Sequence, residues 1–224
     1  MKPHVALFHA TLNAVAPVLD EIRRRAPGAV VRNYLDEGAV VGHEATGDEE
    51  LRAIETRILG WLRCARADGA DGILLTCSIA TPMAAGFESE LGIPVIPIDR
   101  AMLRKAIARG DRIGVLATLP KAAETTRAAL VAAARETDRS ITVNSRVVAG
   151  AFAALSAGRP QEHDASIVRE LEAIAAEADV VVLAQVSMAR ALERACPGST
   201  PVLTSASSAV GDLLTRLGAT GPGA

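Results

Sequence analysis

The chain has few aromatic residues and no long uninterrupted apolar run. Only 2% of its 224 residues are aromatic although 50% are hydrophobic, so the core must be packed mainly from Ala, Val, Leu and Ile. No apolar stretch reaches the roughly 20 residues of a membrane-spanning helix. The first residues, MKPH, lead straight into a strand-like segment and lack the pattern of a signal peptide. The sequence therefore predicts a soluble globular protein of one large or two small domains, without a membrane partner.

Cysteines and basic clusters are also scarce. The three cysteines, Cys64, Cys77 and Cys196, are odd in number and widely spaced, which fits neither a disulfide framework nor a zinc motif. The 24 basic and 26 acidic side chains nearly balance, and no long basic run appears, which argues against a nucleic-acid partner. A reducing cytoplasm is the compartment that these features favour.

What the chain does contain is an internal repeat. Three short segments recur in the same order at nearly the same separation, about half the chain, and so long a period indicates two similar subdomains instead of a solenoid. The pairs are DGILLTCS at 71–78 with DVVVLAQV at 179–186, ATL at 10–12 with ATL at 117–119, and IPVI at 93–96 with TPVL at 200–203. The first pair differs in chemistry where the apolar run ends, because Cys77 lies opposite Gln185.

Short runs rich in Val and Ile alternate with longer helical patterns. This alternation predicts an α/β fold of two pseudo-symmetric parallel-sheet αβα subdomains with the site between them; we place the first at residues 1–98 plus 205–224 and the second at 99–204. The predicted strands are about 4–9, 29–35, 72–77, 94–97, 112–117, 141–148, 179–184 and 201–204. The predicted helices are near 13–26, 48–69, 82–91, 100–109, 120–136, 161–177, 187–195 and 206–217.

Ligands of open parallel sheets bind at the carboxyl ends of the strands, so the segments after the predicted strands are candidates for the site. They are rich in hydroxyls and poor in charge, and hydroxyls with backbone N–H groups at helix starts suit a carboxylate. These segments contain His9, Thr11 and Asn13; residues 36–44 with His43; Thr76, Cys77 and Ser78; Thr118; Gln185 and Ser187; and Thr204, Ser205 and Ser207.

Cys77 ends the third predicted strand at a strand-to-helix turn. We expect Thr81 to cap the helix that Pro82 opens, which would place the thiol near the positive end of that helix and favour its thiolate form. The alternative is a buried structural cysteine that behaves as a small hydrophobe. Cys64 and Cys196 are expected to pack or to face solvent.

The histidines are weaker candidates. His9 either faces the site or is a core histidine whose ring is bonded by backbone groups. His43 is a candidate second proton carrier or a solvated loop residue. His163 is expected at the surface.

These segments resemble the aspartate/glutamate racemase superfamily, which includes amino-acid racemases, hydantoin racemases, maleate isomerase and arylmalonate decarboxylase. The resemblance covers nearly the whole chain and is carried by the repeat, by LTCS at 75–78, by GVLAT at 114–118 and by the second turn at Gln185. It implies two αβ subdomains related by a pseudo-two-fold axis, a site between them and no cofactor. Racemases of this group generally place one cysteine on each side of the substrate carbon, where one removes the α-proton and the other returns a proton.

By this resemblance Cys77 matches the first catalytic cysteine, and Gln185 takes the place of the second. An amide is neither a proton donor nor a base near neutral pH, so the two-thiol route is not expected. Arylmalonate decarboxylase also works with one thiol but retains the other one. The predicted site has Cys77 as the catalytic residue and Thr11, Asn13, Thr76, Ser78, Thr118, Gln185 and Ser187 as substrate-binding residues.

The sequence thus favours a cofactor-independent isomerase or lyase that acts next to the carboxylate of a small molecule. Isomerisation through a thiol adduct, decarboxylation with one-sided protonation, and racemisation with a second acid other than cysteine stay open. The alternative is a catalytically degenerate protein that binds a small carboxylate, and a metal hydrolase or phosphatase would need a ligand cluster that the sequence does not show. A homodimer or higher homo-oligomer is left open as the assembly.

Overall fold

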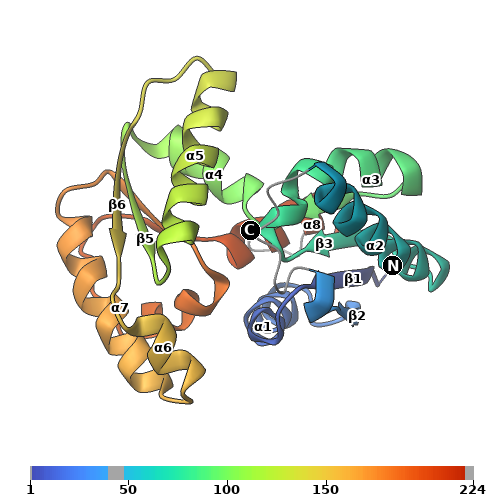
Figure 1. Cartoon of the computed structure of the whole chain (residues 1–224), viewed down its shortest axis with the longest axis horizontal. Helices are drawn as coiled ribbons and strands as arrows, with labels where there is room; N and C mark the ends of the chain where they lie inside the picture. Colours follow the sequence, from blue (N-terminus) through green and yellow to red (C-terminus); the bar gives the residue numbers. More distant parts are fainter. Residues whose placement is uncertain (1, 40–47, 220–224) are drawn as a thin grey trace. The chain divides into compact units, whose positions relative to one another are not determined.

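The computed structural model describes residues 2–39 and 48–219, which form two compact units (Figure 1). The first unit comprises Met1–Arg100 with Ala206–Ala224, and the second comprises Ala101–Ser205. Each unit contains one four-stranded parallel sheet with helices on both faces. The predicted α/β class with parallel sheets is therefore confirmed.

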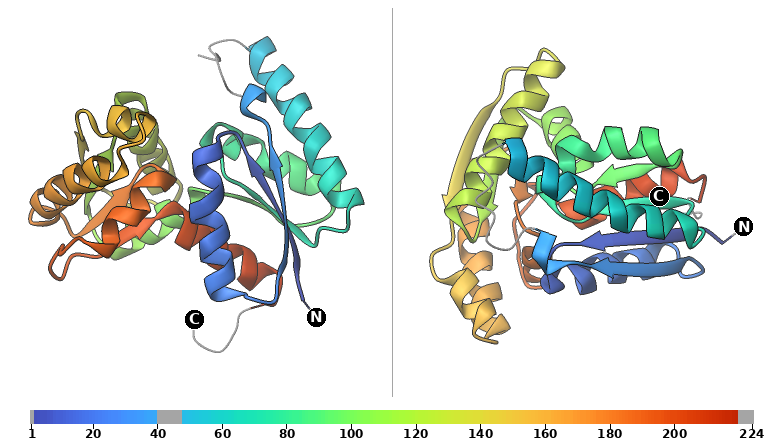
Figure 2. Two further views of the ribbon diagram at one scale, coloured as in Figure 1. Left: turned by 90° about the horizontal axis from the view of Figure 1, so that it is seen from below. Right: turned by 45° about the vertical axis from the view of Figure 1, so that its right-hand side comes forward.

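The first sheet has the strand order β2-β1-β3-β4. The inner strands β1 and β3 are apolar at nearly every position because both of their faces are covered. Helices α2 and α3 pack on one face, and α1 and α8 lie together on the other (Figure 2, left). The elements are β1 (His4–His9), α1 (Val15–Arg25), β2 (Val30–Leu35), α2 (Asp48–Ala67), β3 (Gly72–Leu75), α3 (Ala84–Leu91), β4 (Val95–Pro97) and α8 (Ser205–Arg216).

The second sheet repeats this arrangement with the order β6-β5-β7-β8. Helices α4 and α5 pack against one face, and α6 and α7 pack against the other. The elements are α4 (Arg100–Arg109), β5 (Arg112–Ala117), α5 (Pro120–Glu136), β6 (Thr142–Val147), α6 (Ala151–Ser156), α7 (Pro160–Ala175), β7 (Val180–Leu183) and β8 (Val202–Thr204).

Each unit incorporates the helix that follows the other unit's last strand. Helix α4 follows β4 of the first sheet, but its Met102 and Ile107 belong to the core around β5 and β7. Helix α8 follows β8 of the second sheet, but its Leu213 lies against Gly72 of β3, where an added Cβ would come within 2.9 Å of the leucine. The glycine therefore allows α8 to approach the first sheet closely.

A duplicated hydrogen bond explains the acid that begins each copy of the longest repeat. In the first unit Asp71 Oδ2 accepts the backbone N–H of His4 at 2.8 Å. In the second unit Asp179 Oδ2 accepts the backbone N–H of Arg112 at 2.9 Å. Each carboxylate thus accepts a backbone N–H at the start of the neighbouring central strand. This donor is therefore satisfied at the point where the strand begins.

The structure differs from the sequence-based expectation mainly in the short helices. In the part of the chain that the structure describes, four segments form 3-10 helices: η1 (Leu12–Ala14), η2 (Glu37–Ala39), η3 (Ser78–Met83) and η4 (Val186–Glu193). The predicted helices at 82–91 and 187–195 are therefore partly wrong, since η3 precedes α3 and η4 is 3-10 throughout. Helix α6 was not predicted, because six residues are too few to show a helical period. Within the described ranges no helix is long and apolar enough to cross a membrane.

Candidate functional site

Cys77 and Gln185 occupy equivalent backbone positions in the two units. Each follows the third strand of its sheet and is the extended residue immediately before a 3-10 helix, with φ −114° and ψ 121° for Cys77 and φ −124° and ψ 141° for Gln185. The strands before them also carry equivalent bonds, from Thr76 N–H to the Phe8 carbonyl and from Ala184 N–H to the Leu116 carbonyl, both at 2.9 Å. A thiol and an amide thus end the same structural segment.

Cys77 is half-buried, whereas Cys64 and Cys196 are exposed, and none of the three forms a disulfide. The predicted cap next to Cys77 is wrong, because Thr81 lies inside η3 and its hydroxyl donates to Asp99 Oδ1 at 2.8 Å. The first α-helical residue after Cys77 is Ala84, so the thiol does not lie directly at the start of an α-helix.

His9 is a core residue bonded by side chains and not by the backbone. Its ring is 0% exposed, with Nδ1 3.0 Å from Thr76 Oγ1 and Nε2 3.0 Å from Asn33 Oδ1. Because the amide oxygen of Asn33 only accepts, the arrangement assigns the ring proton to Nε2, and the Thr76 hydroxyl then donates to Nδ1. Burial lowers the pKa of His9, partly offset by the bond to Asn33, so the ring is held neutral. His9 thereby fixes the residue directly before Cys77.

Asp99 is a titratable residue that the sequence analysis did not single out. It lies just beyond β4, where the ladder with β3 continues through Ile98 N–H to the Leu75 carbonyl at 2.9 Å. Burial raises the pKa of the Asp99 carboxyl, and the hydrogen bond from Thr81 works against that rise. The rule that polar residues at carboxyl ends of strands form sites would have included it, since Asp99 lies two residues after the end of the predicted strand 94–97.

In the second unit Gln185 is bonded to the backbone N–H and to the hydroxyl of Thr118. Its Oε1 accepts the backbone N–H of Thr118 at 2.6 Å, and its Nε2 donates to Thr118 Oγ1 at 2.7 Å. Thr118 directly follows β5 and is only 5% exposed, while Gln185 is half-buried. Ser187, two residues further along η4, is also half-buried.

The remaining predicted binding residues are exposed. Thr11 precedes η1 without a side-chain capping bond, and Asn13 lies within η1. Ser78 begins η3. The first unit therefore gathers Thr11, Asn13, Thr76, Cys77 and Ser78 at the carboxyl edge of its sheet, and the second gathers Thr118, Gln185 and Ser187 at the corresponding edge of its own.

The expectation for His163 is wrong. This residue is buried in α7, with 0% of its surface exposed and its Nδ1 2.9 Å from Asp164 Oδ1. Arg190 of η4 pairs with the other oxygen of Asp164 at 3.1 Å, so the cluster ties η4 to α7. Acidic residues on both sides of His163, at the start of a helix, predicted a surface position. The histidine instead lies on the inward face of α7. His43 lies outside the described residues.

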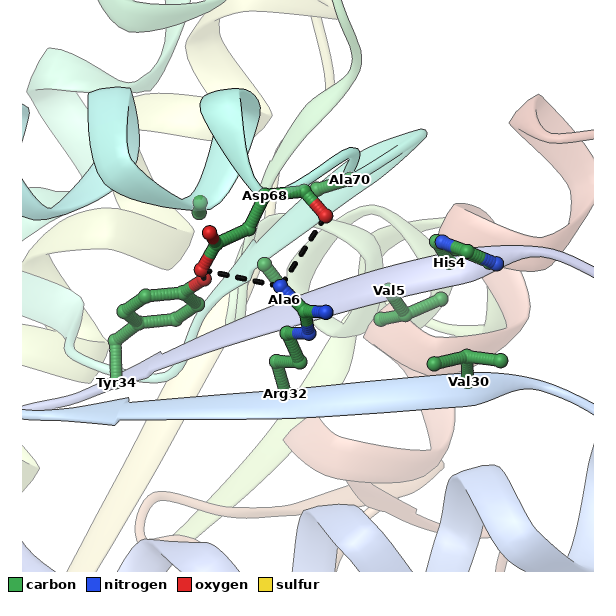
Figure 3. A pocket seen from close by; sticks show the side chains of 9 residues that line it. His4, Val5, Ala6, Val30, Arg32, Tyr34, Asp68 and Ala70 are labelled. Atoms are coloured by element: carbon green, nitrogen blue, oxygen red, sulfur yellow. Dashed lines mark hydrogen bonds and ion pairs between the residues drawn. The ribbon is translucent and has the colours of Figure 1, made fainter.

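A shallow pocket of the first unit lies between β1, β2 and the end of α2 (Figure 3). Its polar side chains bind one another: the Tyr34 hydroxyl donates to Asp68 Oδ2 at 2.6 Å, and Arg32 pairs with the same oxygen at 3.2 Å. None of the predicted site residues lines it. Among the described residues, no three His, Cys, Asp or Glu side chains lie together as metal ligands.

Solved structures of two racemases and a decarboxylase share this fold. Glutamate racemase isoform RacE1 from Bacillus anthracis is 18% identical, with a TM-score of 0.71 over 97% of this chain and 84% of that chain. Allantoin racemase from Klebsiella pneumoniae is 20% identical, with a TM-score of 0.71 over 98% of this chain and 90% of that chain. Unliganded arylmalonate decarboxylase is 16% identical, with a TM-score of 0.61 over 100% of this chain and 94% of that chain.

No curated protein matches the chain. The family model for Asp/Glu/Hydantoin racemase matches residues 9–213, which include nearly all of both units. The superfamily named from the sequence is therefore confirmed, and the chain belongs to the Asp/Glu/hydantoin racemase family.

Proposed function

We propose that this protein is a cofactor-independent isomerase or lyase that acts on the carbon next to the carboxylate of a small molecule, with Cys77 as its only catalytic thiol. The observation that carries this proposal is the equivalence of Cys77 and Gln185 at the ends of β3 and β7. Family membership supports an enzyme, because the fold is shared with racemases and with a decarboxylase.

In the proposed reaction the Cys77 thiolate works from one face of the substrate. As a base it takes the proton from the carbon, and the electron pair of the C–H bond moves into the carboxylate as an enolate. In decarboxylation one carboxylate leaves as CO₂, the electron pair of the broken C–C bond stays behind as the same kind of anion, and the Cys77 thiol donates its proton to that carbon. Exposed hydroxyls of the first unit, Thr11 and Ser78, are the donors proposed to stabilise the negative charge.

The Gln185 side supplies no proton, because an amide does not titrate near neutral pH. The proposed enzyme therefore protonates from one side or adds its thiol covalently to an unsaturated substrate. In the first case a product formed in heavy water carries deuterium with one configuration only.

Substitution of Cys77 tests the assignment. We expect Cys77→Ala to lose at least about 10³-fold in turnover, since proton transfer and nucleophilic attack both need the thiolate. Cys64→Ala and Cys196→Ala are matched controls, because they remove exposed thiols. The measurement is deuterium uptake from heavy water into a panel of 2-substituted carboxylates, followed by NMR and chiral chromatography.

Two outcomes would contradict the proposal. Turnover retained in Cys77→Ala would exclude the thiol. Racemisation at the rate of deuterium uptake would show that a proton donor acts on the opposite face.

A further inference from the structure

The amide of Gln185 is bound so that its orientation is determined. The backbone N–H of Thr118 can only donate, so the atom 2.6 Å from it must be the amide oxygen. The NH₂ group then faces Thr118 Oγ1 at 2.7 Å and donates to it. A rotated amide would place two donors against each other at the backbone N–H.

The two Thr118 groups that Gln185 binds, the backbone N–H and the hydroxyl, are groups that could otherwise bind the carboxylate of a ligand. The backbone N–H of Thr118 has one hydrogen, and it is directed at Gln185 Oε1. Thr118 Oγ1 lies against the amide nitrogen and is 5% exposed with the rest of its residue. A ligand oxygen could take the backbone N–H of Thr118 only by displacing the amide, which would break two hydrogen bonds.

An amide–hydroxyl pair of this kind cannot form at the equivalent position of the first unit. The equivalent bonds from Thr76 and Ala184 to β1 and β5 align Cys77 with Gln185 and Ala10 with Thr118. The structural alignment thus differs by one residue from the repeat of ATL at 10–12 and 117–119, which pairs Thr11 with Thr118. The Ala10 side chain has no hydroxyl, and the Cys77 side chain has no amide group. The closed pair is therefore a feature of the second unit.

We propose that Gln185 is a specificity-determining residue whose amide acts as a built-in ligand of Thr118 and excludes substrate carboxylates from the second unit. The inference rests on the proposed function for its choice of ligand class, and it assigns recognition of the substrate carboxylate to the donors of the first unit. The resemblance alone assigned Thr118 to the substrate carboxylate, so the structure replaces that assignment with an internal bond.

The test is an NMR titration of the full chain with malonate as the probe, following the backbone amide signal of Thr118. In the unmodified protein this signal should not respond to malonate. In Gln185→Ala the freed N–H and hydroxyl should bind the anion, with at least about tenfold tighter malonate binding at this position, since hydrogen bonds to a charged group are worth roughly 1.5–3 kcal/mol.

Two further variants act as controls. Gln161→Ala removes the chain's other glutamine, which is exposed on α7, and should leave the Thr118 signal unresponsive. Gln185→Glu keeps an internal acceptor for the same N–H and adds negative charge, so it should also exclude malonate. Retention of the other amide signals of the second unit shows that each variant is folded, and Gln185→Ser replaces the alanine variant if that one is not.

A malonate response of Thr118 in the unmodified protein as strong as in Gln185→Ala would overturn the inference. Absence of any gain in a folded Gln185→Ala or Gln185→Ser variant would overturn it as well. The readout does not involve turnover, so failure of Cys77→Ala to lose activity would refute the proposed function and leave this result standing.

Discussion

At the scale of single residues, the buried His9, which binds the residue directly before Cys77, makes the stability of the folded protein depend on pH. Its folded pKa is lowered by burial, so the unfolded chain binds the proton more readily, with a pKa of about 6.5. The contribution of neutral His9 to stability is thus fully present above about pH 6.5 and is lost as the pH falls toward the folded pKa.

We expect the unmodified protein to lose more unfolding free energy between pH 7.5 and pH 5 than His9→Gln does, because glutamine does not titrate. The single tryptophan, Trp61 of α2, lies in the same unit, so its fluorescence in urea titrations reports the relevant transition. Parallel stability curves for the two proteins over this range would contradict the assignment of a neutral His9.

Asp99 provides an internal control of opposite sign. Its folded pKa is raised by burial, so its contribution to stability is present below about pH 3.9 and is lost as the pH rises through the folded pKa. Asp99→Asn should therefore become more stable relative to the unmodified protein as the pH rises from 4 toward 7.

At the scale of elements, the short connection into β5 depends on a close approach that only glycine permits. A Cβ on Gly110 would overlap the Cβ of Asp179, the residue whose carboxylate accepts the backbone N–H of Arg112 at 2.9 Å. The clash involves an atom next to the backbone, so it cannot be relieved by rotating a side chain.

We expect Gly110→Ala to destabilise the second unit by about 1–3 kcal/mol, as other forced insertions into packed sites do. Gly86→Ala is the matched control, because this exposed glycine lies inside α3 with nothing within 4 Å of an added Cβ. The control should stabilise by roughly 0.5–1 kcal/mol through helix propensity. Thermal unfolding followed by circular dichroism measures both, and equal effects would refute the role of the close approach.

Elements were predicted well where one local signal dominates. Strands β1 and β5 have the predicted ends because their apolar runs are buried on both faces and stop at polar residues. Helices α4 and α5 also have the predicted ends, and Pro120 at the start of α5 marks a helix start directly. The type of the helices after β3 and β7 was not predictable, since 3-10 and α-helical turns have similar residue patterns.

The candidate site was predictable only as far as positions along the chain. The repeat placed Cys77 and Gln185 at equivalent strand ends without any knowledge of distances. The bonds of Gln185 to Thr118 and of His9 to Thr76 depend on side-chain directions that no sequence pattern specifies. For the same reason the burial of His163 was not predicted, because its two acidic neighbours in the sequence gave the only local signal and one of them, Asp164, is itself buried.

At the scale of the whole molecule, the first unit is incomplete without the last helix of the chain. Val210, Leu213 and Leu214 of α8 are all buried, with at most 3% of their surface exposed. Burial of a Val or Leu side chain stabilises by about 1.5–3 kcal/mol, so the three together contribute about as much as the entire stability of a small domain.

A fragment of residues 1–100 should therefore fail to fold alone, whereas a fragment of residues 101–205 should fold, because it keeps α4 and α5 on its sheet. Addition of a synthetic peptide of residues 205–219 should restore the native Trp61 fluorescence of the first fragment. Native fluorescence of fragment 1–100 without the peptide would contradict this account.

The exchange of α4 and α8 also bears on how such a chain can arise. A half-length ancestor with four strands and a trailing helix would have left one face of its own sheet covered by a single helix, and two identical copies could have completed each other's sheets by exchanging the trailing helix. Fusion of the two copies would then have converted an obligate dimer into one continuous chain. In a fused chain the turns after the third strands need no longer be identical, and here one carries a thiol and the other an amide that binds the neighbouring Thr118.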